Sequence, residues 1–261
     1  MKKRTDILFL LPSLAGTIVF FIIPFVSIFY YAFTENAFSG NFAGFSNFRE
    51  LFGSEYFRLA MKNTLGFTVI AVPLSMFVSL ALAVLIAKSA SKLPFVKSAF
   101  FLPVILPSAV IIVLWSTYYS ETPPFTSLIA IYLWKYSGLN IMLLLTALAE
   151  MNKEMLDAAK IDGAGTMRTM WNVTLPNIAP TLFFTFILSM VNSFKIFRES
   201  YLLYGAYPDE SVYMLQNYLN NHFDKLNYQN IGTAAILFSV IVYTVVGIIF
   251  SAEKKWSRSI W

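Results

Sequence analysis

Long uncharged hydrophobic runs separated by short polar segments dominate the pattern along this chain. Five runs reach the roughly 20 residues that a helix needs to cross a hydrocarbon core about 30 Å thick. They are Ile7–Phe33, Asn63–Ala87, Ser98–Ser120, Val173–Phe194 and Ile231–Ser251. Membrane strands would show shorter, alternating segments, so the pattern predicts helices.

A sixth run, Pro124–Ala149, is interrupted by Lys135. We expect this residue in the outer half of the helix, where a lysine can extend its ammonium to the interface. The composition agrees, because 57% of residues are hydrophobic and only 13% are charged, against roughly 25% charged in soluble domains. The predicted fold class is all-α, a polytopic membrane protein with six transmembrane helices.

The placement of Lys and Arg predicts the orientation. With the N-terminus inside, the inner segments hold Lys2, Lys3, Arg4, Lys88, Lys92, Lys97, Lys153, Lys160, Arg168, Lys254, Lys255 and Arg258. The outer segments hold fewer: Arg49, Arg58, Lys62, Lys135 and Lys225. Both termini are therefore expected in the cytoplasm. The net charge of +5 fits anionic inner-leaflet lipid better than nucleic acid.

Several functions are disfavoured by what the sequence lacks. It has no cysteine and a single histidine, His222, so a metal site is not expected. It has no phosphate-binding loop of the GxxxxGK[ST] kind, so any ATP must be handled by another chain. With no linker or repeat, residues 1–261 are expected to form one permease domain that includes a coupling loop at 150–176.

That polar segment, residues 150–176, is the most informative part of the chain. Asn152 is placed to cap a short helix. Asp162-Gly163 then predicts a turn, because glycine readily adopts a positive φ. Small residues allow a partner backbone to approach, and Met167, Met170 and Trp171 offer apolar contact. The segment thus predicts a docking element, with an ordinary surface loop as the alternative.

The run from Asp157 through Asp162-Gly163-Ala164 to Leu175-Pro176 resembles the EAA loop of binding-protein-dependent ABC import permeases. Asp157, Asn152 and Val173 stand where that family usually has Glu, Pro and Ile. Further similarity lies in Leu10-Leu11-Pro12, Leu102-Pro103, Leu106-Pro107, Asn63-Thr64, Asn192–Phe197 and Gly232–Ala235. The chain is similar to the carbohydrate, maltose-type branch, which has the type I ABC importer permease fold.

The resemblance implies a transport subunit that is not an enzyme, in the cell membrane of a prokaryote. Its expected partners are a second, homologous permease, an extracytoplasmic solute-binding protein, and two ATPase subunits that use ATP and Mg. No cofactor is expected in this chain itself. The residues that would contact the ATPase are Asp157, Ala158, Ala159, Asp162, Gly163, Ala164, Gly165 and Met167.

The resemblance also implies a solute path lined by the third to fifth spans. Its expected residues are Ser189, Asn192, Ser193, Lys195, Ile196, Tyr132, Lys135, Tyr136, Leu139 and Tyr118. Three alternatives remain. Tyr118 suits an interfacial aromatic belt, Lys195 can pair with Glu199 four residues later, and Asn192 can bond a neighbouring helix.

Two rival functions remain. An ABC importer for a non-sugar solute keeps the docking element, although a polyamine would call for acidic residues within the spans, where the sequence shows none. A secondary transporter or channel predicts coupling carboxylates or internal repeats and leaves the polar segment unexplained.

Overall fold

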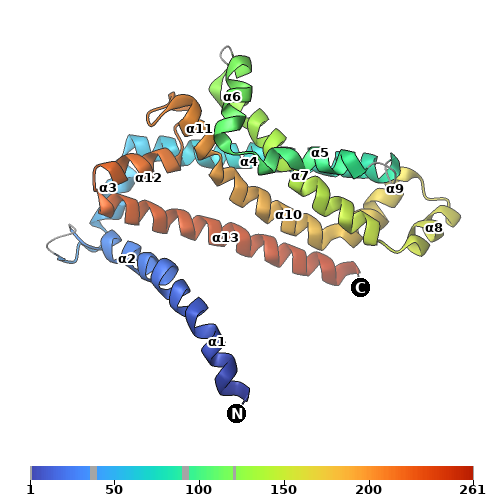
Figure 1. Cartoon of the computed structure of the whole chain (residues 1–261), viewed down its shortest axis with the longest axis horizontal. Helices are drawn as coiled ribbons and strands as arrows, with labels where there is room; N and C mark the ends of the chain where they lie inside the picture. The colour runs from blue at the N-terminus through green and yellow to red at the C-terminus, as the bar shows by residue number, and fades with distance from the viewer. Residues whose placement is uncertain (1, 36–39, 90–93, 120–121, 261) are drawn as a thin grey trace. The chain divides into compact units, whose positions relative to one another are not determined.

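The structure, a computed structural model, describes residues 2–35, 40–89, 94–119 and 122–260, and side chains within 10–35, 40–87, 99–116 and 122–255. Over these residues the chain is helical, with one isolated β-bridge between Thr34 and Phe42 and no strand. The helices (Figure 1) are α1 Lys2–Thr17, η1 Ile18–Ile22, α2 Ile23–Ala32, α3 Ser46–Gly53, α4 Glu55–Ser89, α5 Pro94–Ile105, α6 Ser108–Tyr119, α7 Pro124–Glu150, α8 Lys153–Ile161, α9 Thr166–Thr169, η2 Met170–Thr174, α10 Leu175–Lys195, α11 Phe197–Tyr204, η3 Glu210–Val212, α12 Leu215–Asp224 and α13 Tyr228–Ile260. Of the short η elements, η1 and η2 are π-helical and η3 is a 3-10 turn.

Five helical segments are long and apolar enough to cross a membrane: Leu10–Ala32, Glu55–Ala87, Pro124–Glu150, Thr166–Tyr204 and Tyr228–Lys255. The expected span Ser98–Ser120 differs, because α5 and α6 meet at an angle of 109°. Pro107 has no N–H, and it disfavours a helical conformation at Leu106. Six spans are reached when this bent pair counts as one.

The chain divides into two compact units, which are described separately. The first comprises Met1–Leu59 with Asn217–Tyr243. Within it, Gly232 on α13 lies against the backbone of α2, where an added Cβ would come 2.7 Å from the Ile28 carbonyl oxygen. The buried Asn47 amide donates to the carbonyls of Ala32 and Thr34, both at 2.9 Å. These contacts fix α3 and α13 against the end of α2.

The second unit comprises Ala60–Gln216 with Thr244–Trp261. Helix α7 is its centre and packs against α5 and α10 (Figure 1). One apolar cluster surrounds the N-terminal half of α7 and includes Phe67, Ile111 and Tyr132. A second surrounds the C-terminal half and includes Ala83, Ile141 and Ile178. Every candidate residue for coupling or for the solute path lies in this unit.

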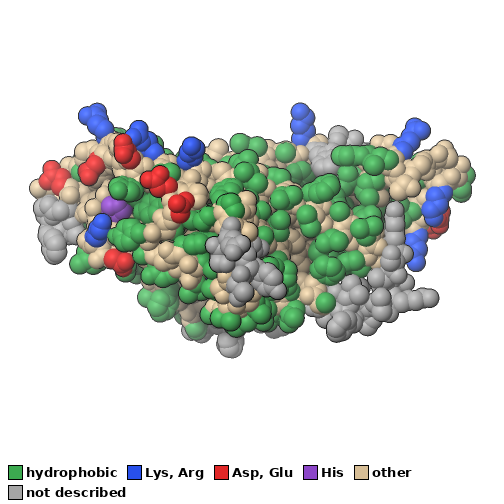
Figure 2. Space-filling view, turned by 90° about the horizontal axis from the view of Figure 1, so that it is seen from above, with side chains coloured by type: hydrophobic (Ala, Val, Ile, Leu, Met, Phe, Trp, Pro, Cys, Tyr) green, Lys and Arg blue, Asp and Glu red, His purple; other side chains and the backbone are tan. Residues whose placement is uncertain are grey.

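Large apolar side chains remain exposed along the predicted spans. Examples are Phe20 and Phe21 on η1, Phe77 on α4 and Tyr243 on α13. Hydrophobic side chains cover much of the surface in Figure 2, and most of the charged side chains lie toward its two ends. An apolar surface of this extent is suited to lipid or a membrane-embedded partner rather than to water.

Candidate coupling element and solute path

Helix α8 begins and ends at signals that the sequence contains. The Asn152 side chain accepts a hydrogen bond from the Glu154 N–H at 2.9 Å, which confirms the predicted cap. At the other end, Gly163 has φ +72°. Its N–H donates to the Lys160 carbonyl at 3.0 Å, and the Ala164 N–H donates to the Ala159 carbonyl at 2.9 Å. This pair of bonds is a Schellman motif, so Asp162-Gly163-Ala164 is the segment that stops α8.

The polar face of α8 is open to its surroundings. Asp157 accepts a hydrogen bond from the Lys160 ammonium at 2.8 Å, and both side chains are exposed. This contact with Lys160 lowers the pKa of the Asp157 carboxyl. Ala158 is exposed and Ala159 is half-buried. The small side chains of Ala158 and Ala159 therefore leave room for a partner backbone to approach this face.

Apolar side chains flank this face. Met167 is 70% exposed and Trp171 is 64% exposed, as expected for contact residues, whereas Met170 turns partly inward. Ile161, the last residue of α8, is 87% exposed. Sequence reasoning missed it, although a lone isoleucine directly before a polar Asp-Gly turn was the available signal. Exposed apolar residues beside small ones are typical of interface anchors.

A half-open groove of about 410 Å³ lies between α8 and the ends of the helices behind it. Its walls come from α4, α7, α8, the following turn, α9 and η2: Val84, Ala87, Leu148, Met151, Leu156, Lys160, Ala164, Thr166, Thr169, Met170 and Thr174. The groove leaves the side of α8 that faces it only partly packed against the rest of the unit.

The chain after the turn is continuous with the fifth span. The elements α9, η2 and α10 follow one another without a break, and Pro176 sits in the first turn of α10. The proline follows the π-helical turn η2, in which the Leu175 N–H donates to the Met170 carbonyl, so its missing N–H falls where the regular helical bonding is already interrupted. The π-helical turn η2 lies at the junction, a position where such turns often mark functional sites.

Most residues expected along the solute path are enclosed within this chain. Tyr132, Ser189 and Ile196 are fully buried, and Tyr136, Lys135, Asn192 and Ser193 nearly so. Leu139 is half-buried and Lys195 is exposed. Tyr118 belongs to α6, but its side chain lies outside the described residues. The assignment of these residues to a path stays a prediction, and in this conformation most of them face neighbouring helices.

Hydrogen bonds explain why Ser189 is enclosed. The Asn140 amide on α7 donates to the Ser189 hydroxyl at 2.7 Å, and the Tyr132 hydroxyl donates to the Ser189 carbonyl at 2.7 Å. Ser193 lies 2.9 Å from the Thr68 hydroxyl on α4. These contacts are the interhelical bonds that polar residues form in membranes. Sequence reasoning missed Asn140, whose partners lie about 50 residues away.

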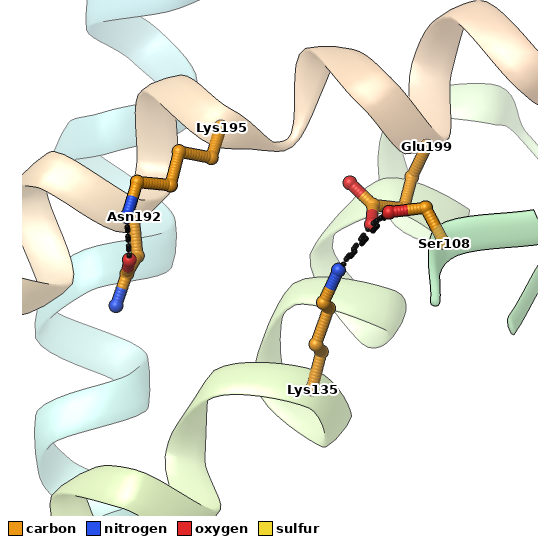
Figure 3. A network of polar contacts seen from close by, with 5 residues as sticks. All are labelled: Ser108, Lys135, Asn192, Lys195 and Glu199. Carbon is orange, nitrogen blue, oxygen red and sulfur yellow. Dashed lines mark hydrogen bonds and ion pairs between the residues drawn. The ribbon is translucent and has the colours of Figure 1, made fainter. Parts of the chain in front are cut away.

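Lys135 does not reach the interface as predicted. Its ammonium lies 2.6 Å from Oε1 of Glu199 on α11, and the side chains are 9% and 0% exposed (Figure 3). The Ser108 hydroxyl donates to the same oxygen at 2.7 Å and accepts from Lys135 at 3.2 Å. Within the described residues Glu199 therefore pairs with Lys135 rather than with Lys195, because α10 ends before Glu199.

Lys195 and Asn192 form a separate contact at the end of α10. The Lys195 ammonium donates to the Asn192 amide oxygen at 3.2 Å (Figure 3). Lys195 is exposed, so it leaves a positive charge at the surface of the unit close to Asn192. Ammonium and amide groups together can bind a hydroxyl or an anionic group of a solute.

The sequence and fold are similar to those of known transport proteins. Residues 79–256 match the family described as binding-protein-dependent transport system inner membrane component. The chain is 28% identical to the arabinooligosaccharides transport system permease protein AraP of Bacillus subtilis, over 95% of this chain and 88% of that one. It is 31% identical to the sn-glycerol-3-phosphate transport system permease protein UgpA of Yersinia pestis, over 72% of each. A chain of a bacterial alginate ABC transporter, solved in complex with an alginate pentasaccharide-bound periplasmic protein, superposes with a TM-score of 0.80 at 20% identity, covering 98% of this chain and 96% of that one.

The helices, the broken third span and the capped loop before the fifth span thus define a multi-pass membrane protein with the type I ABC importer permease fold. The chain belongs to the family of inner membrane components of binding-protein-dependent transport systems.

Proposed function

We propose that this chain is the permease subunit of an ATP-driven importer that takes up a carbohydrate, most simply an oligosaccharide. The observation that carries the proposal is the capped helix α8 with its Schellman turn, which presents an exposed face at the end of a membrane bundle. The transport of arabinooligosaccharides and alginate in the names of similar proteins supports the cargo class.

The partners follow from the chemistry that this chain lacks. Two ATPase subunits bind ATP and Mg, a second permease completes the path, and an extracytoplasmic protein delivers the solute. The periplasmic protein in the alginate complex supports the last assignment. Both termini and α8 face the cytoplasm of a prokaryotic cell, as the distribution of Lys and Arg favours.

The residues divide into two proposed groups. ATPase contact is assigned to Asp157, Ala158, Ala159, Asp162, Gly163, Ala164, Gly165 and Met167, with Ile161 added because of its exposure. Solute contact is assigned first to Asn192 and Lys195. Lys195 is exposed, whereas Asn192 and the other enclosed residues of the predicted path pack against their neighbours in this conformation and reach the solute only if the helices move.

Purification of the intact complex tests this function. The affinity-tagged chain should bring down an ATPase and a second permease from mild detergent, and the purified chain alone should not bind ATP. Nucleotide binding by the isolated chain, or a complex without an ATPase, would contradict the proposal.

An importer for an acidic carbohydrate is a second candidate, supported by the exposed ammonium of Lys195 next to Asn192. Uptake of neutral and of carboxylated or phosphorylated sugars by the whole system distinguishes the two. Lys195→Gln should reduce uptake of the acidic sugars about tenfold, as expected for loss of one charge-assisted contact, and leave neutral sugars unaffected. Equal uptake of acidic sugars by Lys195→Gln and the parent excludes this candidate.

A further inference from the structure

The buried ion pair Lys135–Glu199, together with Ser108, joins three helices, one of which follows a sharp bend. Ser108 is the first residue of α6, directly after the 109° bend. Glu199 is the third residue of α11, which begins after α10 ends at Lys195. Lys135 lies within the continuous helix α7. One network therefore fastens α6, which follows the bend, and α11, the end of the long segment Thr166–Tyr204, to the continuous helix α7.

A buried ion pair contributes little net stability to a permanent contact between helices at this position. Removing two charges from water costs several kcal/mol per ion, which offsets most of their attraction, and apolar side chains of similar volume often stabilise more. Within the described residues, the second carboxylate oxygen of Glu199, Oε2, is buried without a hydrogen-bond partner. The carboxylate is thus only partly satisfied when the pair is closed.

Opening the pair to water would restore hydration to both ions. The net free energy between its closed and open forms is therefore small compared with that of an apolar contact, which has to expose hydrophobic surface in order to separate. When the closed and open forms differ little in free energy, a small change in interactions elsewhere in the molecule is enough to shift the population from one form to the other. Buried ionic groups are best attested in register and switching roles.

We propose that Lys135, Glu199 and Ser108 form a charge latch that holds α6 and α11 against α7 in one state of the transport cycle and opens in another. The proposal rests on the proposed function, because it requires a transport cycle. These are positioning residues: they act on the solute path through the two helices they hold. The ring of Tyr136, with its centroid 5.3 Å from the Lys135 ammonium, borders the latch.

Distances between spin labels in the assembled transporter test the latch. The chain has no cysteine, so labels can be placed by single substitutions, with the other subunits made cysteine-free. Val113 on α6, Leu202 on α11 and Thr146 on α7 are exposed. The Val113–Thr146 and Leu202–Thr146 distances should differ between the nucleotide-free and the ATP-trapped complex. Thr126–Thr146, both on α7 and exposed, is the matched control and should not change.

Paired substitutions separate a latch from simple packing. The double variant Lys135→Met with Glu199→Met should be at least as thermally stable as the parent. Its label distances should no longer change with nucleotide state, and its uptake should fall at least tenfold. The exchanged pair, Lys135→Glu with Glu199→Lys, should recover part of the distance change and part of the uptake. Arg198→Gln, which removes an exposed charge next to Glu199, should behave as the parent in the distance measurement.

Three results would overturn the latch: a double Met variant with unchanged distances and uptake, an exchanged pair no better than the double Met variant, or equal distances in both nucleotide states of the parent. A failure of the proposed function is seen separately. In that case no ATPase accompanies the chain, whatever the labels report.

Discussion

Gly138 on α7 lies directly against the backbone of Phe100 on α5. A Cβ added to Gly138 would overlap the Phe100 carbonyl oxygen and come 2.7 Å from its carbonyl carbon. The two helices cross at this point with no room for a side chain, as small residues allow in membrane bundles. The position of α5, and of the bend that follows it, therefore depends on one missing methyl group.

Gly138→Ala should separate α5 from α7 and destabilise the chain by about 2 kcal/mol or more, since the obstacle is backbone that cannot rotate away. The measurement is thermal unfolding of the purified chain in detergent. Gly66→Ala is the control: nothing lies within 4 Å of its added Cβ, so this helical position should gain about 0.5 kcal/mol. Equal unfolding temperatures for the two variants would contradict the close crossing.

Gly163→Ala should weaken the end of α8 by about 1 kcal/mol, because an L-residue resists the φ of +72° that the Schellman turn needs. Gly163→Pro and Ala159→Trp should abolish transport while membrane insertion remains normal. Copurification of the ATPase is the measurement. Gly247→Ala, on α13 with open space around its Cβ, is the matched control. Retention of the ATPase by Gly163→Pro or by Ala159→Trp would show that α8 does not dock.

Ser189 and Asn192 are expected to respond differently to substitution. Ser189→Ala removes the partner of the Asn140 amide and should cost about 1 kcal/mol of stability, with little change in sugar preference. Asn192→Leu should reduce uptake or change that preference and leave assembly with the ATPase normal. Uptake of an oligosaccharide panel and thermal unfolding are the two measurements. Unchanged uptake by Asn192→Leu would assign this residue to helix packing.

His222 should make stability depend on pH. It lies on α12 beside Tyr218, with ring centroids 4.3 Å apart. Burial lowers the pKa of His222, the nearby Lys225 lowers it further, and Glu50 opposes the shift. The unfolded chain therefore takes up a proton first, so stability is fully present above pH about 6.5 and falls as pH decreases through the lower folded pKa.

Thermal unfolding measured between pH 7.5 and 5.5 tests this dependence. His222 is the chain's one histidine, so His222→Phe, which keeps an aromatic ring next to Tyr218, should remove most of the dependence in this range. A variant that loses stability with acid as steeply as the parent would assign the effect to other groups.

The parts of the structure that the sequence predicted depend on neighbouring residues. The cap at Asn152, the positive φ at Gly163 and the apolar spans all follow from local pattern. The angle of 109° at Pro107 could not be predicted, because an apolar run interrupted by proline is equally consistent with one kinked helix or with two short ones.

The remaining features depend on contacts between distant segments. Lys135 and Glu199 are 64 residues apart, and no periodicity links them. The nearer Lys195 has the i, i+4 spacing that suggested a helical pair, but the end of α10 intervenes. The hydrogen bond between Ser189 and Asn140 could not be predicted, because only the polar character of each residue is visible in the sequence.

The unbroken helical path from Thr166 to Lys195 has a mechanical consequence. At about 1.5 Å per residue, its 30 residues span at most roughly 45 Å, with the Asp162-Gly163-Ala164 turn just before one end and Asn192 and Lys195 at the other. If α8 docks as proposed and this path moves as a rigid body, a tilt of about 10° at the turn would move the far end by up to about 8 Å. This displacement exceeds the diameter of a sugar ring. A small rotation at the membrane surface would therefore move the far end of the helix far enough to admit or release one sugar.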